Sequence, residues 1–157
     1  MRTRTYRSVV YFGAGLGLIA ALFAAAEFYD TELTKACTFS AYWSCGRIAN
    51  SGLTTTLGVQ DWIWGVVGFV LILLFAALAE RRRRDARMTY LLLLVTTVGV
   101  ALSLYFLYVE VVQIGGLCPV CVSAYLLGWV AWLGSVGLAW KTYRREHPGP
   151  DEAPAAA

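Results

Sequence analysis

The sequence has little charge and almost no histidine. Only 15% of its 157 residues are charged, whereas 59% are hydrophobic and 14% are aromatic. A soluble domain of this size cannot bury so much apolar surface, so the composition excludes that class. The chain also contains no phosphate-binding glycine loop, no internal repeat and no pair of catalytic carboxylates. Its one histidine, His147, lies in the tail EHPGPDEAPAAA and is poorly placed for catalysis.

Four long apolar runs are present instead, at residues 9–28, 62–79, 88–114 and 121–140. A helix needs roughly 20 such residues to cross a hydrocarbon core about 30 Å thick. The first run follows arginines, as in a secretory signal, but it is too long and EFYD is a poor cleavage site. The sequence therefore predicts an all-α integral membrane protein, a four-transmembrane-helix bundle over residues 1–145. Residues 146–157, rich in proline and alanine, are expected to be a disordered tail.

Basic residues gather before the first run, between the second and third, and after the fourth. With four crossings these segments share one side, which the positive-inside rule makes cytoplasmic. Only Lys35 and Arg47 lie on the other side. The net charge of +3 therefore reflects topology and attraction to anionic lipids, not nucleic-acid binding. We expect a multi-pass protein of the cell (plasma) membrane with both termini in the cytoplasm.

All four cysteines fall on the outer side in this topology. Cys37 and Cys45 lie in the loop of residues 29–61, and Cys118 and Cys121 lie where the third run gives way to the fourth. The outer side of a membrane is a compartment in which disulfides persist. The outer loop is expected to contain a short helix and to cover the outer mouth of the bundle.

The close pair in CPVC is predicted to be reactive. Pro119 suits the first turn of a helix, where its missing N–H is no loss, so Cys118 and Cys121 fall at the start of the fourth helix. The positive end of a helix dipole favours a thiolate over a thiol. A purely structural disulfide is the alternative, although so short a ring is often reducible.

The loop pair, Cys37 and Cys45, is separated by seven residues in CTFSAYWSC. A disulfide that only staples the loop has the same pattern. A zinc site of four cysteines is another interpretation, since Cys-x2-Cys is half of a common zinc pattern. The wide spacing of the other half and an oxidising compartment oppose it, so we expect no metal.

Together these features resemble the vitamin K epoxide reductase family and its bacterial and archaeal members, from the first helix to the fourth. The matching residues are Cys37, Cys45 and Ser51 in CTFSAYWSCGRIANS, Cys118, Cys121 and Tyr125 in CPVCVSAY, and the glycines of GVQDWIWGVVGF. The resemblance implies electron transfer from protein thiols to a membrane quinone of the ubiquinone, menaquinone or vitamin K type.

In that family a thioredoxin-like (DsbA-like) carrier exchanges disulfide with the loop pair, which here is Cys37 and Cys45. Cys45 would then attack Cys118, and Cys121 would deliver the electrons to the quinone. Such exchange proceeds through mixed disulfides. The result would be disulfide formation in exported proteins.

The resemblance also suggests residues that support this chemistry. Tyr125 matches a tyrosine that hydrogen-bonds a quinone carbonyl, while Asp61 falls near an asparagine that polarises the other carbonyl and could donate only if protonated. Trp64 could line the quinone pocket, although Trp64 and Tyr125 could instead be interfacial anchors. Ser51 either supports the cysteines or caps a short helix that begins near it. Glu110, inside the third run, is either functional or simply solvated.

Three functions stay open at this point. The first is quinone-linked disulfide formation, and the second is reduction of vitamin K epoxide or quinone on the same fold. The third is a non-catalytic membrane scaffold whose cysteines only staple loops. Convergent DsbB-like oxidases place the close cysteine pair in the first outer loop, whereas here it comes second. The compact chain and its run of four arginines look microbial, which favours disulfide formation.

Overall fold

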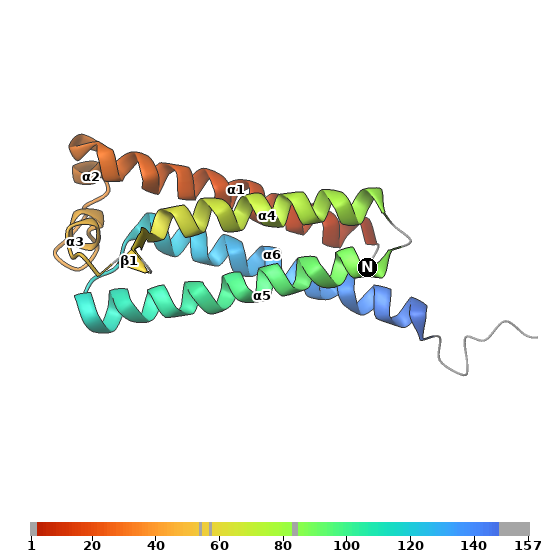
Figure 1. Cartoon of the computed structure of the whole chain (residues 1–157). Coiled ribbons are helices and arrows are strands. Elements are labelled where there is room, and N and C mark those ends of the chain that lie inside the picture. Colours follow the sequence, from red (N-terminus) through yellow and green to blue (C-terminus); the bar gives the residue numbers. More distant parts are fainter. Residues whose placement is uncertain (1–2, 54, 57, 83–84, 148–157) are drawn as a thin grey trace, which may run out of the picture.

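Four long helices form the body of the computed structural model, which describes residues 3–53, 55–56, 58–82 and 85–147. These helices are α1 (Thr3–Tyr29), α4 (Asp61–Arg81), α5 (Ala86–Tyr108) and α6 (Pro119–Glu146), and a π-helical segment, η1 (Val109–Ile114), continues α5. All four are long and apolar enough to cross a membrane, counting α5 and η1 as one helix. They lie side by side as a bundle (Figure 1), so the predicted all-α membrane fold is confirmed.

Each predicted apolar run lies within one of these helices. The last helix reaches Glu146, the first residue of the predicted disordered tail. Residues 148–157 of that tail lie outside the described residues.

Glycines let α1 and α6 pack closely. A Cβ atom at Gly13 would lie 2.7 Å from the carbonyl oxygen of Leu127, and one at Gly134 would lie 2.7 Å from Cγ2 of Val10. Val10 is fully buried at this contact. In membrane proteins small residues at a helix interface permit such close approach. The outward-facing side chains are large and apolar, including Phe12, which suits contact with lipid.

Buried polar side chains join α5 to α6. The hydroxyl oxygens of Thr96 and Ser135 lie 2.7 Å apart, and both residues are almost fully buried. The indole N–H of Trp129 donates to the hydroxyl of Ser103 over 2.8 Å. Hydrogen bonds between helices stabilise membrane bundles because lipid offers no alternative partner.

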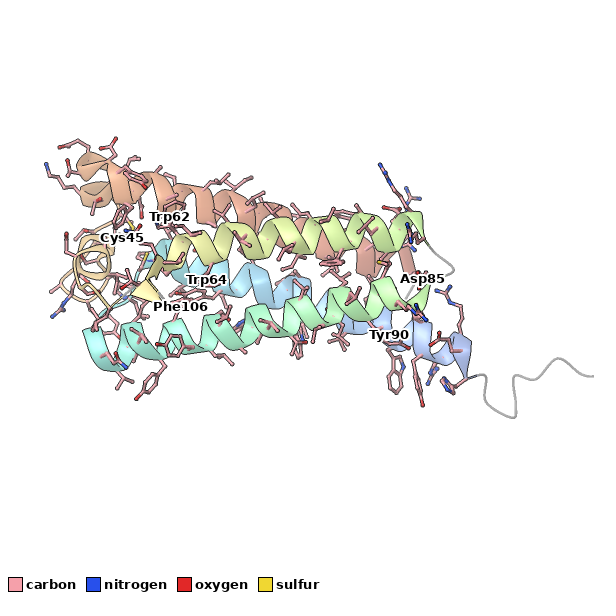
Figure 2. The ribbon with its side chains drawn as sticks, in the orientation of Figure 1. Cys45, Trp62, Trp64, Asp85, Tyr90 and Phe106 are labelled. Carbon is pink, nitrogen blue, oxygen red and sulfur yellow. A yellow bond between two sulfur atoms is a disulfide. The ribbon has the colours of Figure 1, made fainter. Side chains whose placement is uncertain are left out.

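The two ends of the bundle differ. The N-terminal end of α1, the last turn of α4, the first turn of α5 and the C-terminal end of α6 lie at one end. The cysteine-bearing segments lie at the other, as the positions of Asp85 and Cys45 show (Figure 2). The predicted separation of the basic segments from the cysteines is therefore present in the fold.

The segment between α1 and α4 covers the cysteine end. It contains two short helices, α2 (Thr31–Ala36) and α3 (Cys45–Ala49), and a small hairpin of β1 (Thr55–Thr56) and β2 (Val59–Gln60). Ser44 begins α3 as its N-cap, accepting a hydrogen bond from the backbone N–H of Arg47. The prediction of a cysteine-bearing loop with a short helix is thus confirmed, and the loop has a second helix besides.

Candidate active site

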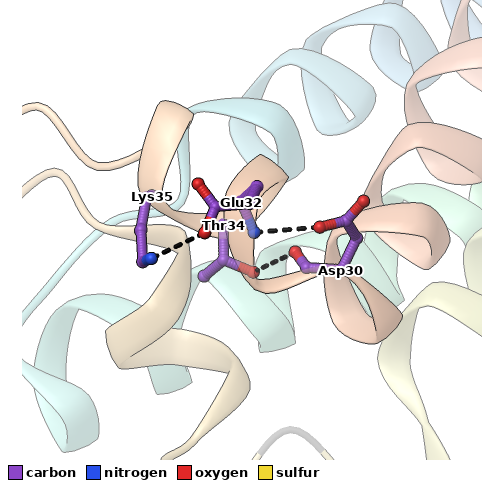
Figure 3. A network of polar contacts seen from close by, with 4 residues as sticks. All are labelled: Asp30, Glu32, Thr34 and Lys35. Atoms are coloured by element: carbon purple, nitrogen blue, oxygen red, sulfur yellow. Dashed lines mark hydrogen bonds and ion pairs between the residues drawn. The ribbon is translucent and has the colours of Figure 1, made fainter.

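A polar network fixes the turn from α1 into α2 (Figure 3). The carboxylate of Asp30 caps α2 by accepting from the backbone N–H of Glu32 over 2.9 Å. The hydroxyl of Thr34 donates to the carbonyls of Asp30 (3.0 Å) and Glu27 (2.7 Å). Lys35 pairs with Glu32, but both side chains are exposed and such pairs add little stability. The network therefore fixes the orientation of α2 relative to α1, and with it the position of Cys37, which directly follows α2.

A second set of backbone contacts ties the outer loop to the chain before α6. Trp43 forms a parallel β-bridge with Leu117. The N–H of Ser44 donates to the carbonyl of Leu117 (3.1 Å), and the N–H of Leu117 donates to the carbonyl of Tyr42 (2.8 Å). Gly116 is needed here because a Cβ would lie 3.2 Å from the Tyr42 oxygen. Cys45 directly follows Ser44, and Cys118 directly follows Leu117. The bridge therefore brings these two cysteines close together.

The two cysteine pairs are in contact. Cys37 and Cys45 form a disulfide, while Cys118 and Cys121 are free thiols. The Sγ of Cys45 lies 3.2 Å from the Sγ of Cys118, which in turn accepts from the backbone N–H of Cys121. As predicted, the close pair starts a helix, since Cys118 is the N-cap of α6. Two of the four sulfurs are bonded to each other, so this state offers no set of four thiolates for zinc.

Glu110 holds the start of α6 in place. It projects from η1 and is only 2% exposed. One carboxylate oxygen accepts from the backbone N–H of Cys118 (3.2 Å), and the other accepts from the hydroxyl of Tyr125 (2.7 Å). The alternative that Glu110 is simply solvated is therefore wrong. Its signal in the sequence was a carboxylate inside an apolar run, which commonly marks function.

Glu27 is a second buried carboxylate at this end, and the sequence analysis missed it. It lies near the end of α1 and is 5% exposed. One of its carboxylate oxygens and the sulfurs of Cys37, Cys45 and Cys118 all lie within 4.8 Å of one another. Among the described residues, its Oε1 has no hydrogen-bond partner. The available signal was again an acidic residue within a predicted membrane span.

A cavity of about 340 Å³ lies between α1, α4, α5 and α6. Its polar end is lined by Cys121, Tyr125, Asp61 and Trp64, so the three predicted quinone-binding residues and the second CPVC cysteine face one space. Most of the remaining lining is apolar, from Val67, Gly68, Phe69, Leu71 and Ile72 on α4 and Leu94, Val95, Val98, Gly99, Leu102 and Phe106 on α5. The site is thus an apolar chamber with a few polar groups next to a thiol.

Four residues line both this cavity and a smaller one at the sulfurs, namely Ala24, Asp61, Trp62 and Cys121. The smaller cavity, of about 40 Å³, is also lined by Glu27, Cys45 and Cys118. The carboxylate of Asp61 accepts from the adjacent backbone N–H at the start of α4 over 2.7 Å. The two cavities therefore share one thiol and one carboxylate.

Trp64 lines the larger cavity and carries an unused hydrogen-bond donor. Its indole Nε1 is buried and has no hydrogen-bond partner among the described residues. A buried indole N–H usually has a partner, so this N–H is an unsatisfied donor in the wall of the cavity.

Ser51 does not cap a helix that begins near it, because α3 ends at Ala49 before it. That alternative is wrong. Its hydroxyl donates to the carbonyl of Ile48 (2.8 Å) and accepts from the N–H of Leu53 (3.3 Å). Ile48 is buried in the cluster that holds three of the four sulfurs. Support of the cysteine chemistry by Ser51 stays a prediction, and it would act through Ile48.

Comparison with known protein families gives one match. The model of the vitamin K epoxide reductase family matches residues 8–136 of the chain. This range includes the four cysteines, both buried glutamates and every residue that lines the larger cavity. No curated protein matches the chain.

Proposed function

Because the chain belongs to the vitamin K epoxide reductase family, we propose that it is a quinone-linked thiol oxidoreductase that drives disulfide formation in exported proteins. Family membership implies oxidoreductase activity, and the four apolar helices make the chain a multi-pass membrane protein. In the proposal a thioredoxin-like (DsbA-like) carrier reduces the loop disulfide. Electrons then pass through the CPVC pair to a quinone.

The 3.2 Å contact between the sulfurs of Cys45 and Cys118 carries this proposal. Thiol–disulfide exchange requires direct contact between the attacking and the attacked sulfur. Cys45 attacks Cys118, the bond from Cys118 to Cys121 breaks, and Cys37 then displaces Cys118 from Cys45. The described state, with a loop disulfide and two free CPVC thiols, is the one in which electrons have reached the inner pair.

The larger cavity fits a quinone ring. Small-molecule sites are typically about 300–1,000 Å³, mostly apolar, with a few polar groups that fix orientation. Here the volume is about 340 Å³, and Trp64, Asp61 and Tyr125 line the cavity together with Cys121. A bound quinone supplies a two-electron, two-proton acceptor. The cavity also reaches the lipid-facing surface between α4 and α5, where Leu94 and Val98 are more than half exposed.

The state of Glu110 controls what Tyr125 can do in this cavity. The hydroxyl of Tyr125 donates its one proton to Glu110 in the structure. To donate to a carbonyl instead, Tyr125 must accept a hydrogen bond from a protonated Glu110. Glu110 thus positions Tyr125 and can pass a proton towards the cavity, while its other oxygen keeps the N–H of Cys118 in place.

We place the cysteine end on the outer face of the cell membrane. The basic segments lie at the opposite end of the bundle, and basic residues gather on the cytoplasmic side. On the outer side the loop pair is accessible to a soluble carrier in a compartment that keeps disulfides oxidised.

The proposal is tested by anaerobic quinol formation from reduced thioredoxin and a short-chain ubiquinone, measured by absorbance. Wild-type protein is expected to form quinol, and Cys45→Ala and Cys121→Ala to lose it. Ser123→Ala is the control, since Ser123 is exposed on the same helix and bonds only the carbonyl of Pro119 among its described contacts. Equal rates in Cys45→Ala and wild type would overturn the relay. In a parallel assay vitamin K epoxide replaces ubiquinone. If the protein consumes the epoxide but does not reduce the quinone, the epoxide reductase on the same fold is favoured.

A further inference from the structure

We propose that Glu27 is the proton acceptor and donor for exchange between the two cysteine pairs. This inference rests on the relay proposed above and assigns to it a catalytic residue outside the cysteines and the quinone pocket. It starts from the position of one carboxylate beside three sulfurs.

The carboxylate of Glu27 lies where the exchange takes place. One of its oxygens and the sulfurs of Cys37, Cys45 and Cys118 lie within 4.8 Å of one another. The backbone of Glu27 is held by the hydroxyl of Thr34, which donates to its carbonyl over 2.7 Å. The side chain is therefore fixed at the sulfurs by the same turn that positions α2.

One oxygen of this carboxylate, Oε1, takes part in no hydrogen bond among the described residues. Glu27 is 5% exposed. Neither of the two ion pairs in the described part of the chain includes it. A buried carboxylate without partners is costly in free energy, and in a membrane span such a group commonly has a function.

The titratable residues that face Glu27 are the four cysteines, two of which form the loop disulfide in the described state, and one acid. Cys37 and Cys45 belong to the outer loop between α1 and α4. Cys118 and Cys121 lie at the start of α6, and Asp61 lies at the start of α4. The proton that Glu27 exchanges within this cluster is therefore that of a thiol.

The other two carboxylates near the sulfurs, Glu110 and the partly buried Asp61, accept hydrogen bonds from described residues. Glu110 uses one oxygen for the N–H of Cys118 and the other for the hydroxyl of Tyr125. Asp61 accepts the N–H of Trp62 at the start of its own helix. Glu27 is the carboxylate with a buried oxygen left free beside the sulfurs.

The chemistry requires such a group because the thiolate, not the thiol, attacks a disulfide. In the first step Cys45 gives its proton to Glu27 and its sulfur attacks Cys118. The Cys118–Cys121 bond breaks, and Cys121 leaves with the electron pair. The proton passes from Glu27 to Cys121 through the small cavity that both residues line. A mixed Cys45–Cys118 disulfide results, with Cys121 as a new thiol and Cys37 as an unchanged one.

The second step repeats the proton transfer. Cys37 gives its proton to Glu27 and attacks Cys45, and the Cys45–Cys118 bond breaks. Cys118 leaves with the electron pair and takes the proton. Two electrons have then moved from the loop pair to the inner pair. The thiols of Cys37 and Cys45 have become a disulfide, the disulfide of Cys118 and Cys121 has become two thiols, and Glu27 has returned to its starting state.

The test isolates the first step in the variant Cys37→Ser, in which Cys45 cannot return to its loop partner. Fully reduced protein is mixed with short-chain ubiquinone, quenched with acid at intervals and alkylated. The Cys45–Cys118 link is then measured by mass spectrometry from pH 5.5 to 9. The comparison is Cys37→Ser alone against Cys37→Ser with Glu27→Gln, Glu27→Asp or Glu32→Gln. Glu32→Gln makes the matched change at an exposed carboxylate of the next helix, α2.

With Glu27→Gln we expect the link to form at least tenfold more slowly at pH 6.5, since general base catalysis contributes roughly 10²–10⁴-fold. The rate in the Glu27→Gln protein should then rise with pH as the thiolate fraction rises. The difference in rate between this protein and Cys37→Ser alone should therefore narrow near pH 9. Glu27→Asp should retain the pH profile of Glu27, and Glu32→Gln should change nothing. A merely structural role would lower the rate equally at every pH.

Two outcomes would overturn the proposal in different ways. If the link forms in both proteins at the same rate and with the same pH profile, Glu27 has no role in the exchange while the relay stands. If the link never forms in Cys37→Ser, although ubiquinone is reduced, the relay itself is wrong and the role of Glu27 falls with it. As a control on folding, the thermal unfolding of Glu27→Gln is measured. Unfolding at the same temperature as the wild type would show that the fold is intact.

Discussion

Replacing Glu110 by alanine or by glutamine should have sharply different effects. Glu110 is 2% exposed and accepts two hydrogen bonds, from the N–H of Cys118 and the hydroxyl of Tyr125. Alanine leaves both donors buried without a partner, at a cost of about 1–3 kcal/mol for each. The sum is about 2–6 kcal/mol, a large part of the roughly 5–15 kcal/mol that stabilises an ordinary domain.

Glutamine keeps the geometry. Its oxygen accepts the N–H of Cys118, and its NH₂ donates to the oxygen of Tyr125, as a protonated Glu110 would. The loss is limited to the difference between a charged and a neutral hydrogen bond, about 1 kcal/mol. Glutamine cannot release a proton, however. We therefore expect Glu110→Gln to keep the KM for quinone within a few fold and to lower kcat by about 10²-fold, the lower end of the range for general acid catalysis.

The assay is thermal unfolding of the detergent-solubilised protein, followed by tryptophan fluorescence, together with steady-state quinol formation. A loss of 1 kcal/mol lowers Tm by about 2–4 °C in a chain of this size, so Glu110→Ala should unfold about 4–24 °C below wild type and Glu110→Gln within about 4 °C. An unchanged Tm in Glu110→Ala would refute the structural reasoning. An unchanged kcat in Glu110→Gln would refute the transfer of a proton through this residue.

Three further changes probe the cavity and the bundle. Trp64→Phe removes an indole N–H that has no partner among the described residues, so Tm should hold while the KM for quinone rises about threefold to tenfold, the equivalent of one hydrogen bond; an unchanged KM would mean that this N–H does not contact the quinone. Gly99→Leu adds a side chain into the cavity, since nothing lies within 4 Å of a Cβ there, and should raise the KM at constant Tm. Its control is Gly15→Leu, which is equally open but does not line the cavity, and equal KM values for the two would count against quinone binding there. Gly13→Val forces a Cβ against the backbone of α6 and should cost about 1–3 kcal/mol by overpacking, measured as a lower Tm, whereas Gly15→Val should not; equal Tm values would show that α1 and α6 can separate at no cost.

Several features could be predicted from the sequence because they depend on neighbouring residues. The length of each apolar run predicted a membrane helix, since the thickness of the hydrocarbon core sets the number of residues required. Pro119 marked the first residue of α6, because proline is well tolerated only in the first turn. The spacing of the cysteines carried the family resemblance, which the family match supports.

Errors and omissions in the site have a common origin. Ser51 was assigned as a possible helix cap because serine favours that position, but α3 ends at Ala49 and the next helix begins at Asp61. Glu27 was overlooked because its sequence neighbours are apolar and its functional neighbours are 10 or more residues away along the chain. The role of Glu110 stayed open because exposure near a helix end is not a property of the local sequence.

The sequence by itself determined four membrane helices, a close cysteine pair at a helix start and a second pair in the connecting loop. Composition, run length and capping act within a few residues, so they can be recognised without a fold. Only the tertiary structure decided that Cys45 meets Cys118, that Glu27 lies against the sulfurs, and that Trp64 and Tyr125 face one cavity. Those contacts join segments distant in the chain, and they depend on how closely the helices pack and where the outer loop is anchored.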